Sequence, residues 1–214
     1  MPITILLADD HGVVRDGLQL LLSAQPDLRV VGVADDGRQA VRLAAELRPH
    51  VALLDISMPE LNGVEATRQI VAAQIGVRVI ILSMHAAAEH IGQALRAGAR
   101  GYLLKESAGS EVVAAVRAVH DGERYFSRKI SDTVPEEYLR GGPAADPLAS
   151  LSPREREILQ LVVEGKSSAE AARILSLSPK TVETYRSRLM QKLGLSDLPS
   201  LVRFAIQRGL TPLE

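Results

Sequence analysis

Apolar residues in the first 125 positions follow two alternating patterns. Short continuous apolar runs, typical of buried strands, alternate with longer segments whose apolar residues recur at i, i+3 and i+4, as in amphipathic helices. The runs predict strands over residues 3–8, 29–34, 51–55, 78–83 and 101–105, and a helical segment follows each of them. Such alternation predicts right-handed crossovers and a parallel sheet covered by helices on both faces. The fold expected for residues 1–125 is therefore α/β, a doubly wound five-stranded parallel sheet.

The pattern changes after position 125. Residues 126–150 contain three prolines and a Gly-Gly pair, which indicates a linker, with one short helix around "PEEYLR". Residues 151–214 show no strand pattern, and their periodicity predicts four helices over about 152–164, 167–175, 178–193 and 197–208. The segments "SPRE" and "SSAE" are capping boxes that begin the first two of these helices. The chain is thus expected to end in an all-α domain.

Composition excludes several classes of protein. The chain contains no cysteine, which rules out a disulfide framework and thiolate metal sites and fits a reducing cytoplasm. The start "MPITILLADDHG" has no basic region, so it does not predict a signal peptide. No apolar run approaches the roughly 20 residues of a membrane helix. We therefore expect a cytoplasmic protein with no membrane partner.

Charge differs between the two parts of the chain. The formal net charge is only −1 at pH 7. Residues 1–125 hold 12 Lys and Arg against 15 Asp and Glu, whereas residues 151–214 hold 10 against 7. An acidic first domain and a basic second domain indicate that the two bind different partners.

Ionisable and hydroxyl side chains stand at the carboxyl ends of four predicted strands. Asp9 and Asp10 close the first strand, Asp55 the third, Ser83 the fourth and Lys105 the fifth. In a doubly wound sheet these ends lie along one edge, where functional groups gather. Carboxylates so close together raise each other's pKa values unless a cation relieves them. Mg²⁺, which prefers oxygen ligands, is the expected cofactor.

Together these groups form a set suited to phosphoryl transfer. One carboxylate would be the nucleophile, the metal and Lys105 would neutralise the phosphoryl oxygens, and Ser83 would detect the phosphate. Each residue alone also has a simpler interpretation. Asp10 can be a helix N-cap, Asp55 can cap the following loop, and Lys105 can be a solvated lysine. Their joint occurrence at four strand ends favours phosphoryl transfer.

Four segments of the first domain resemble the receiver domains of bacterial two-component response regulators. They are "LLADDH", "LLDISMPELNG", "IILSMH" and "ARGYLLK". The spacing also fits this family, with 28 positions from Asp55 to Ser83 and 22 from Ser83 to Lys105. The resemblance implies a flavodoxin-like fold in which Asp55 accepts a phosphoryl group from a sensor histidine kinase and becomes 4-aspartylphosphate.

The resemblance also implies roles for the surrounding residues. The Mg²⁺ ligands would be the backbone carbonyl of Ser57 and the carboxylates of Asp9, Asp10 and Asp55. Ser83 and Lys105 would contact the phosphoryl group. Tyr102 would be a switch that turns inward when Ser83 shifts, although on its own an aromatic residue at this position is more often a core side chain than a switch.

The helix predicted over 178–193 has one apolar face and one polar face. The turn "SLS" joins it to the preceding helix, as in a helix-turn-helix whose second helix enters the DNA major groove. Its cations suit phosphates, and the short side chains of Thr184 and Ser187 can reach base edges. A solvated amphipathic helix in an interaction module fits the same pattern, so the residues alone leave both interpretations open.

The stretch "LSPREREILQLVVEGKSSAEAARILSLSPKTVETYRSRLMQKLG" resembles the LuxR-type helix-turn-helix. The whole chain resembles the NarL/FixJ subfamily of response regulators. This resemblance places three side chains at base-reading positions: Glu183, Thr184 and Ser187. It places five on the backbone of double-stranded DNA: Lys180, Thr181, Arg186, Arg188 and Lys192. The last helix pairs two such domains in this family, which implies a homodimer, when phosphorylated or on DNA, and inverted half-sites about 10 bp apart.

The function expected from these observations is that of a phosphorylation-controlled transcriptional regulator. It would not be an enzyme, because a receiver assists only its own phosphorylation and dephosphorylation. There are two alternative functions. A phosphatase or nucleotide-binding enzyme is disfavoured because the chain has neither a G-x-G-x-x-G motif after its first strand nor a P-loop. A phosphorylation-independent DNA-binding regulator, with the receiver as a dimerisation module, remains consistent with the sequence.

Overall fold

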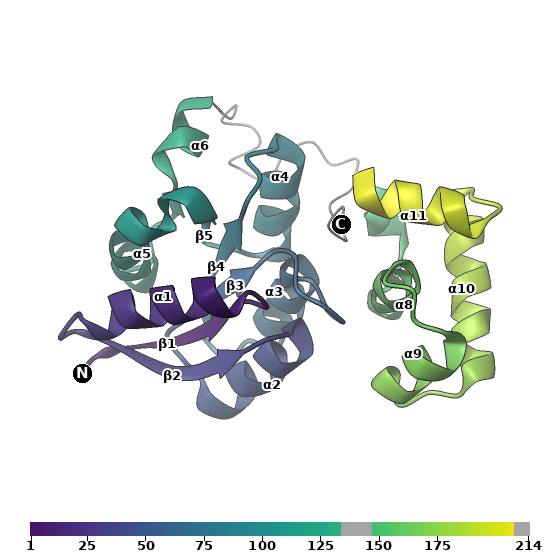
Figure 1. Cartoon of the computed structure of the whole chain (residues 1–214), viewed down its shortest axis with the longest axis horizontal. Helices are drawn as coiled ribbons and strands as arrows, with labels where there is room; N and C mark the ends of the chain where they lie inside the picture. Colours follow the sequence, from purple (N-terminus) through teal and green to yellow (C-terminus); the bar gives the residue numbers. More distant parts are fainter. Residues whose placement is uncertain (134–146, 208–214) are drawn as a thin grey trace. The chain divides into compact units, whose positions relative to one another are not determined.

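The computed structural model describes residues 1–133 and 147–207. The chain divides into two compact units, Met1–Pro143 and Ala144–Glu214 (Figure 1). The short helix expected around "PEEYLR" lies outside the described residues.

The first unit is built on a six-stranded sheet with the order β2-β1-β3-β4-β5-β6, and every pair of neighbouring strands is parallel. The strands are β1 (Ile3–Ala8), β2 (Leu28–Ala34), β3 (Val51–Asp55), β4 (Arg78–Ser83), β5 (Gly101–Leu104) and β6 (Tyr125–Phe126). The helices are α1 (Gly12–Ser23), α2 (Gly37–Leu47), α3 (Gly63–Ala72), α4 (Ala88–Ala97), α5 (Lys105–His120) and α6 (Arg128–Thr133). This order places the carboxyl ends of β1, β3, β4 and β5 next to one another.

Two apolar layers hold the sheet between its helices. Successive residues of β1 alternate between them, because side chains of a strand point to opposite faces. Ile5 packs in the layer that contains residues of α1 and α5, whereas Leu6 packs in the layer that contains residues of α2, α3 and α4. Helices therefore cover both faces, as the doubly wound prediction requires (Figure 1).

The sequence prediction missed the sixth strand and the helix after it. Tyr125 is the last residue of the range predicted for the first domain, whereas Phe126 and the helix Arg128–Thr133 lie in the range predicted as linker. A strand of two residues shows no periodicity, so only its pairing reveals it: the backbone N–H of Tyr125 donates to the carbonyl of Arg100 over 3.1 Å. The prediction also placed Lys105 in the fifth strand, whereas it is the first residue of α5.

The second unit is helical, as predicted. It contains a short 3₁₀ helix, η1 (Pro147–Ser150), followed by α8 (Pro153–Val163), α9 (Ser168–Leu175), α10 (Pro179–Leu193) and α11 (Leu198–Gln207). Both predicted capping boxes are present, with Ser152 capping α8 and Ser167 capping α9. The four helices share one core that includes Ile158, Val182 and Leu201, each fully buried.

Candidate functional site

Three carboxylates meet at the ends of β1 and β3. Asp9 and Asp55 are almost fully buried, at 0% and 2% exposed, while Asp10 is open to solvent. Asp9, Asp10, His11 and Asp55 each offer one ligand atom, and all of these atoms lie within 4.8 Å of one another. The oxygens of Asp10 and Asp55 are therefore close enough to bind the same cation.

Lys105 brings a positive charge to the two buried carboxylates. Its Nζ lies 2.9 Å from Asp9 Oδ2 and 3.0 Å from Asp55 Oδ2. Those contacts are ionic, and neither oxygen makes a well-directed hydrogen bond to any residue that the structure describes. Buried carboxylate oxygens with unused lone pairs suit a hard cation, so the residues present fit a Mg²⁺ ion.

The surroundings of Asp55 change its affinity for protons. Burial raises the pKa of its carboxyl from an ordinary value near 3.8 to about 6, and the charge of Asp9 adds to the increase. The ammonium of Lys105 partly offsets it. Burial lowers the pKa of Lys105, but the charges of Asp55 and Asp9 outweigh that effect, and the net pKa of Lys105 is raised. The cluster thus carries excess negative charge that a further cation would relieve.

We expect Asp55→Asn to stabilise the fold at neutral pH without Mg²⁺. Because the folded pKa of Asp55 lies above its unfolded pKa, the stability linked to its proton is complete below about pH 3.8 and is lost as the pH rises through about 6. The Asp55→Asn variant has no carboxyl at this position, so its stability does not fall in this way as the pH rises. Its free energy of unfolding in EDTA should exceed that of the wild type by about 2–3 kcal/mol at pH 7.5. Urea unfolding at pH 4 and 7.5 measures the gap, and an equal gap at both pH values would contradict the pKa assignment.

Asp10 is not the N-cap of the first helix. The N-cap residue of α1 is His11, which makes no side-chain capping bond. Asp10 Oδ1 instead lies 2.8 Å from His11 Nδ1. The simpler interpretation of Asp10 as a helix cap is therefore wrong, and its carboxylate stays beside the other two.

The ends of β4 and β5 place a hydroxyl and an aromatic ring beside the same loop. Ser83 is fully buried, and its Oγ accepts a hydrogen bond from the His85 N–H over 3.0 Å. Tyr102 is also fully buried, and its hydroxyl donates to the His85 carbonyl over 3.0 Å. Burial raises the pKa of Tyr102, while a hydrogen bond with Ser83 acts in the opposite direction. The backbone of His85 thus links Ser83 to Tyr102, which points inward and is part of the core.

The loop after Asp55 returns so closely to its strand that only glycine fits at its end. A Cβ on Gly63 would lie 2.2 Å from the carbonyl oxygen of Asp55. The Gly63 N–H donates to the Ile56 carbonyl over 3.0 Å, and Asn62 caps α3. Gly63 therefore fixes the backbone from which the Asp55 side chain projects.

Gly63→Ala is expected to lower the free energy of unfolding by about 2–3 kcal/mol, because backbone atoms must move to admit the methyl group. Gly109→Ala is the matched control. Gly109 lies inside α5 with open space where a Cβ would be, so alanine there should stabilise the protein by about 0.5–1 kcal/mol. Chemical denaturation of both variants measures the difference. Equal stability of the two variants would show that the close approach at Gly63 is unimportant.

In the second unit, α9, a turn and α10 form a helix-turn-helix. Val182 and Leu189 of α10 are fully buried, which leaves the opposite face of the helix to solvent. Of the predicted DNA-binding residues on this helix, Lys180, Glu183, Thr184, Ser187, Arg188 and Lys192 are exposed and Thr181 and Arg186 are half-buried. A cavity of about 350 Å³ on it is lined by Ser178, Lys180, Thr181, Thr184, Tyr185 and Arg188. The structure thus brings the predicted residues together on one helix.

Lys192 has a partner that the sequence did not reveal. Its Nζ lies 2.7 Å from Oε2 of Glu155, whose side chain is 3% exposed. The same Glu155 oxygen accepts the Ser152 N–H in the capping box of α8. Lys192 therefore connects α10 to the start of α8, and a DNA phosphate would have to share its ammonium group with Glu155.

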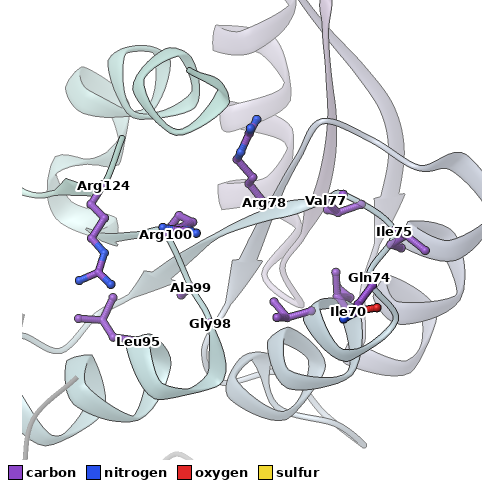
Figure 2. Close-up of a pocket in the computed structure, with 12 residues that line it drawn as sticks. Ile70, Gln74, Ile75, Val77, Arg78, Leu95, Gly98, Ala99, Arg100 and Arg124 are labelled. Atoms are coloured by element: carbon purple, nitrogen blue, oxygen red, sulfur yellow. The ribbon is translucent and has the colours of Figure 1, made fainter. Parts of the chain in front are cut away.

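A separate cavity of about 680 Å³ lies at the opposite ends of the strands from the carboxylate cluster, where β4 and β5 begin. Its lining is partly apolar, with Ile70 and Leu95, and partly cationic (Figure 2). Arg78 donates to the carbonyl of His120 over 2.6 Å. Because this cavity opens at the amino ends of the strands, it is not part of the carboxylate cluster.

No helix within the described ranges is long and apolar enough to span a bilayer.

Two families match the chain. Residues 5–117 match the response regulator receiver domain, and residues 149–205 match the bacterial regulatory proteins of the luxR family. The first range lies within the first unit of the structure, and the second range lies within the second unit.

Related proteins agree with these matches. The response regulator UvrY of Escherichia coli K12 is 37% identical over 212 residues, which cover 99% of this chain and 97% of UvrY. The crystal structure of a LuxR-family two-component response regulator from Aurantimonas sp. SI85-9A1 is similar with a TM-score of 0.61 and 35% identity, over 65% of this chain and 99% of that one. The RcsB–DNA complex is similar with a TM-score of 0.59 and 25% identity, over 97% of this chain and 99% of that one. The chain belongs to the NarL/FixJ subfamily of response regulators, transcription regulators with a receiver domain and a LuxR-type DNA-binding domain.

Proposed function

We propose that this regulator is controlled by phosphorylation of Asp55, with a sensor histidine kinase as the donor and double-stranded DNA as the target. The observation that carries the proposal is the position of Lys105, whose ammonium group contacts both buried carboxylates, Asp9 and Asp55, at the edge of the sheet. A lysine placed there can neutralise the charge of a phosphoryl group on either carboxylate. Such a regulator would act in the cytoplasm and would turn over no substrate of its own.

The chemistry assigned to Asp55 is a single displacement at phosphorus. One carboxylate oxygen forms a bond to the phosphorus of a phosphohistidine while the P–N bond breaks, and the imidazole leaves with the electron pair and takes up a proton. Asp55 must be ionised to attack, so its raised pKa slows the reaction below about pH 6. Lys105 stays protonated and attracts the transferred oxygens.

The remaining residues would hold a Mg²⁺ ion and detect the product. The ion's ligands in this proposal are the carboxylates of Asp9, Asp10 and Asp55 and the backbone carbonyl of Ser57. When bound, the metal supplies positive charge that neutralises the phosphoryl oxygens. The hydroxyl of Ser83 then turns toward the new phosphate, and Tyr102 follows because both contact His85.

DNA binding completes the proposal. In it, α10 enters the major groove, where Glu183, Thr184 and Ser187 read base edges. Lys180, Thr181, Arg186, Arg188 and Lys192 contact the phosphate backbone. The similar RcsB structure is a complex with DNA. Two copies of the chain would bind inverted half-sites, and phosphorylation would shift the population toward the state competent to bind.

Phosphotransfer to the full-length protein tests the proposal. The protein is incubated with acetyl phosphate and Mg²⁺, and its intact mass is measured. We expect the mass of one added phosphoryl group, mapped to Asp55, and a much slower reaction in EDTA. An unchanged mass with both acetyl phosphate and a purified sensor kinase as donors would contradict it.

A further inference from the structure

The segment that leaves the sheet after β6 is hydrogen-bonded to β5 and to the start of α5, on either side of Lys105 in the chain. Ser127, the residue after β6, is fully buried. Its N–H donates to the carbonyl of Tyr102 over 3.1 Å. Its Oγ accepts the N–H of Leu104 over 3.0 Å and lies 2.9 Å from the Oγ of Ser107. Ser127 thus contacts Tyr102, the residue proposed as the switch, and two residues close to Lys105 in the chain, Leu104 of β5 and Ser107 of α5.

The Ser127 hydroxyl accepts a hydrogen bond from β5 that β6 is too short to accept. The pairing of β5 with β6 stops at Tyr102 and Phe126, so β6 offers no carbonyl to the next outward N–H of β5, that of Leu104. A buried amide without an acceptor is costly, and the side chain of Ser127 supplies one. The bond therefore joins the backbone immediately before Lys105 to the chain that leaves the sheet.

Ser127 also determines where the next helix begins. Its carbonyl accepts the N–H of Ile130 over 2.8 Å and that of Ser131 over 3.1 Å, which starts α6. Ile130 is fully buried in the same apolar layer as Tyr102 and Leu104. On the surface, Lys129 Nζ lies 2.8 Å from Glu106 Oε1. Helix α6 is thus attached to the start of α5 by a buried hydrogen-bond network and an exposed ion pair.

We propose that Ser127 is a positioning residue that couples the phosphoryl group on Asp55 to the segment leading to the DNA-binding domain. The inference rests on the proposed function. When Ser83 turns toward the phosphate and Tyr102 follows, the backbone of β5 shifts, and the carbonyl of Tyr102 and the N–H of Leu104 move with it. Both are bonded to Ser127, so the start of α6 follows, and α6 precedes the DNA-binding domain in the chain.

The test measures a coupling ratio, defined as the dissociation constant for a DNA duplex without phosphorylation divided by that with phosphorylation. Both values come from the full-length protein, and the phosphorylated fraction is determined by intact mass. In Ser127→Ala the ratio should fall at least about fivefold toward 1, while the phosphorylated fraction stays within about twofold of wild type. Ser127→Thr, which keeps the hydroxyl, should retain most of the ratio.

Two further variants keep the test decisive. Ser131→Ala changes an exposed serine of the same helix and should leave the ratio unchanged. Ser107→Ala removes the partner of the Ser127 hydroxyl, together with the hydrogen bond that Ser107 Oγ donates to the Leu104 carbonyl, and it should lower the ratio even if Ser127→Ala fails to fold. A wild-type protein that is not phosphorylated, or whose affinity does not respond, would refute the proposed function itself. A wild-type ratio that persists in Ser127→Ala and Ser107→Ala would refute only the role of Ser127.

Discussion

Asp55→Asn is expected to reduce phosphorylation by acetyl phosphate to background. The variant keeps the size and polarity of the side chain but removes the anionic oxygen that attacks phosphorus. Asp9, the other buried carboxylate, is not a substitute nucleophile in this proposal, because its Oδ1 accepts the His11 N–H over 2.9 Å and its Oδ2 contacts Lys105. Intact mass after a fixed incubation with donor and Mg²⁺ measures the loss.

Asp16→Asn is the matched control for this experiment. It makes the same chemical change at an exposed position of α1, outside the carboxylate cluster. It should be phosphorylated at the wild-type rate. If Asp55→Asn still acquires the wild-type amount of phosphoryl group, the nucleophile is another residue.

The second large effect is expected on DNA binding. Arg188→Ala should weaken binding about tenfold at physiological salt, by a similar factor for all DNA sequences, because a phosphate contact carries no sequence information. The plot of log affinity against log salt concentration should become shallower by about 1 for each subunit bound. Arg188 is exposed and lines the cavity on α10, so the substitution disturbs no buried contact.

Fluorescence anisotropy with a labelled duplex at several salt concentrations measures this effect. Arg29→Ala, at an exposed position of β2, is the control and should leave both the affinity and the salt dependence unchanged. A change in sequence preference without a change in the salt slope would instead show that Arg188 reads a base.

The sequence predicted the fold and the carboxylate cluster because both depend on local patterns. The strand-end positions of Asp9, Asp55 and Lys105 follow from the apolar runs before them. The parallel topology then brings these ends together, as the structure confirms. The capping boxes of α8 and α9 could be predicted for the same reason, because their partners are three residues apart.

The missed features depend on contacts between distant residues. Only two residues of β6 pair with β5, and two residues are too few to show the alternating pattern that predicts a strand. Lys192 and Glu155 are 37 positions apart, and Ser127 is 23 positions from Leu104. Polar side chains of this kind look like ordinary surface residues in a sequence, and only the folded backbone shows that they meet partners.

The affinity of the wild-type protein for a DNA duplex carrying its binding site, measured with and without phosphorylation of Asp55, addresses the regulatory mechanism most directly. Phosphate on Asp55 should change the dissociation constant by about tenfold or more, which corresponds to a preference of about 1.4 kcal/mol or more for one state. Identical dissociation constants at complete phosphorylation would mean that the receiver does not control DNA binding.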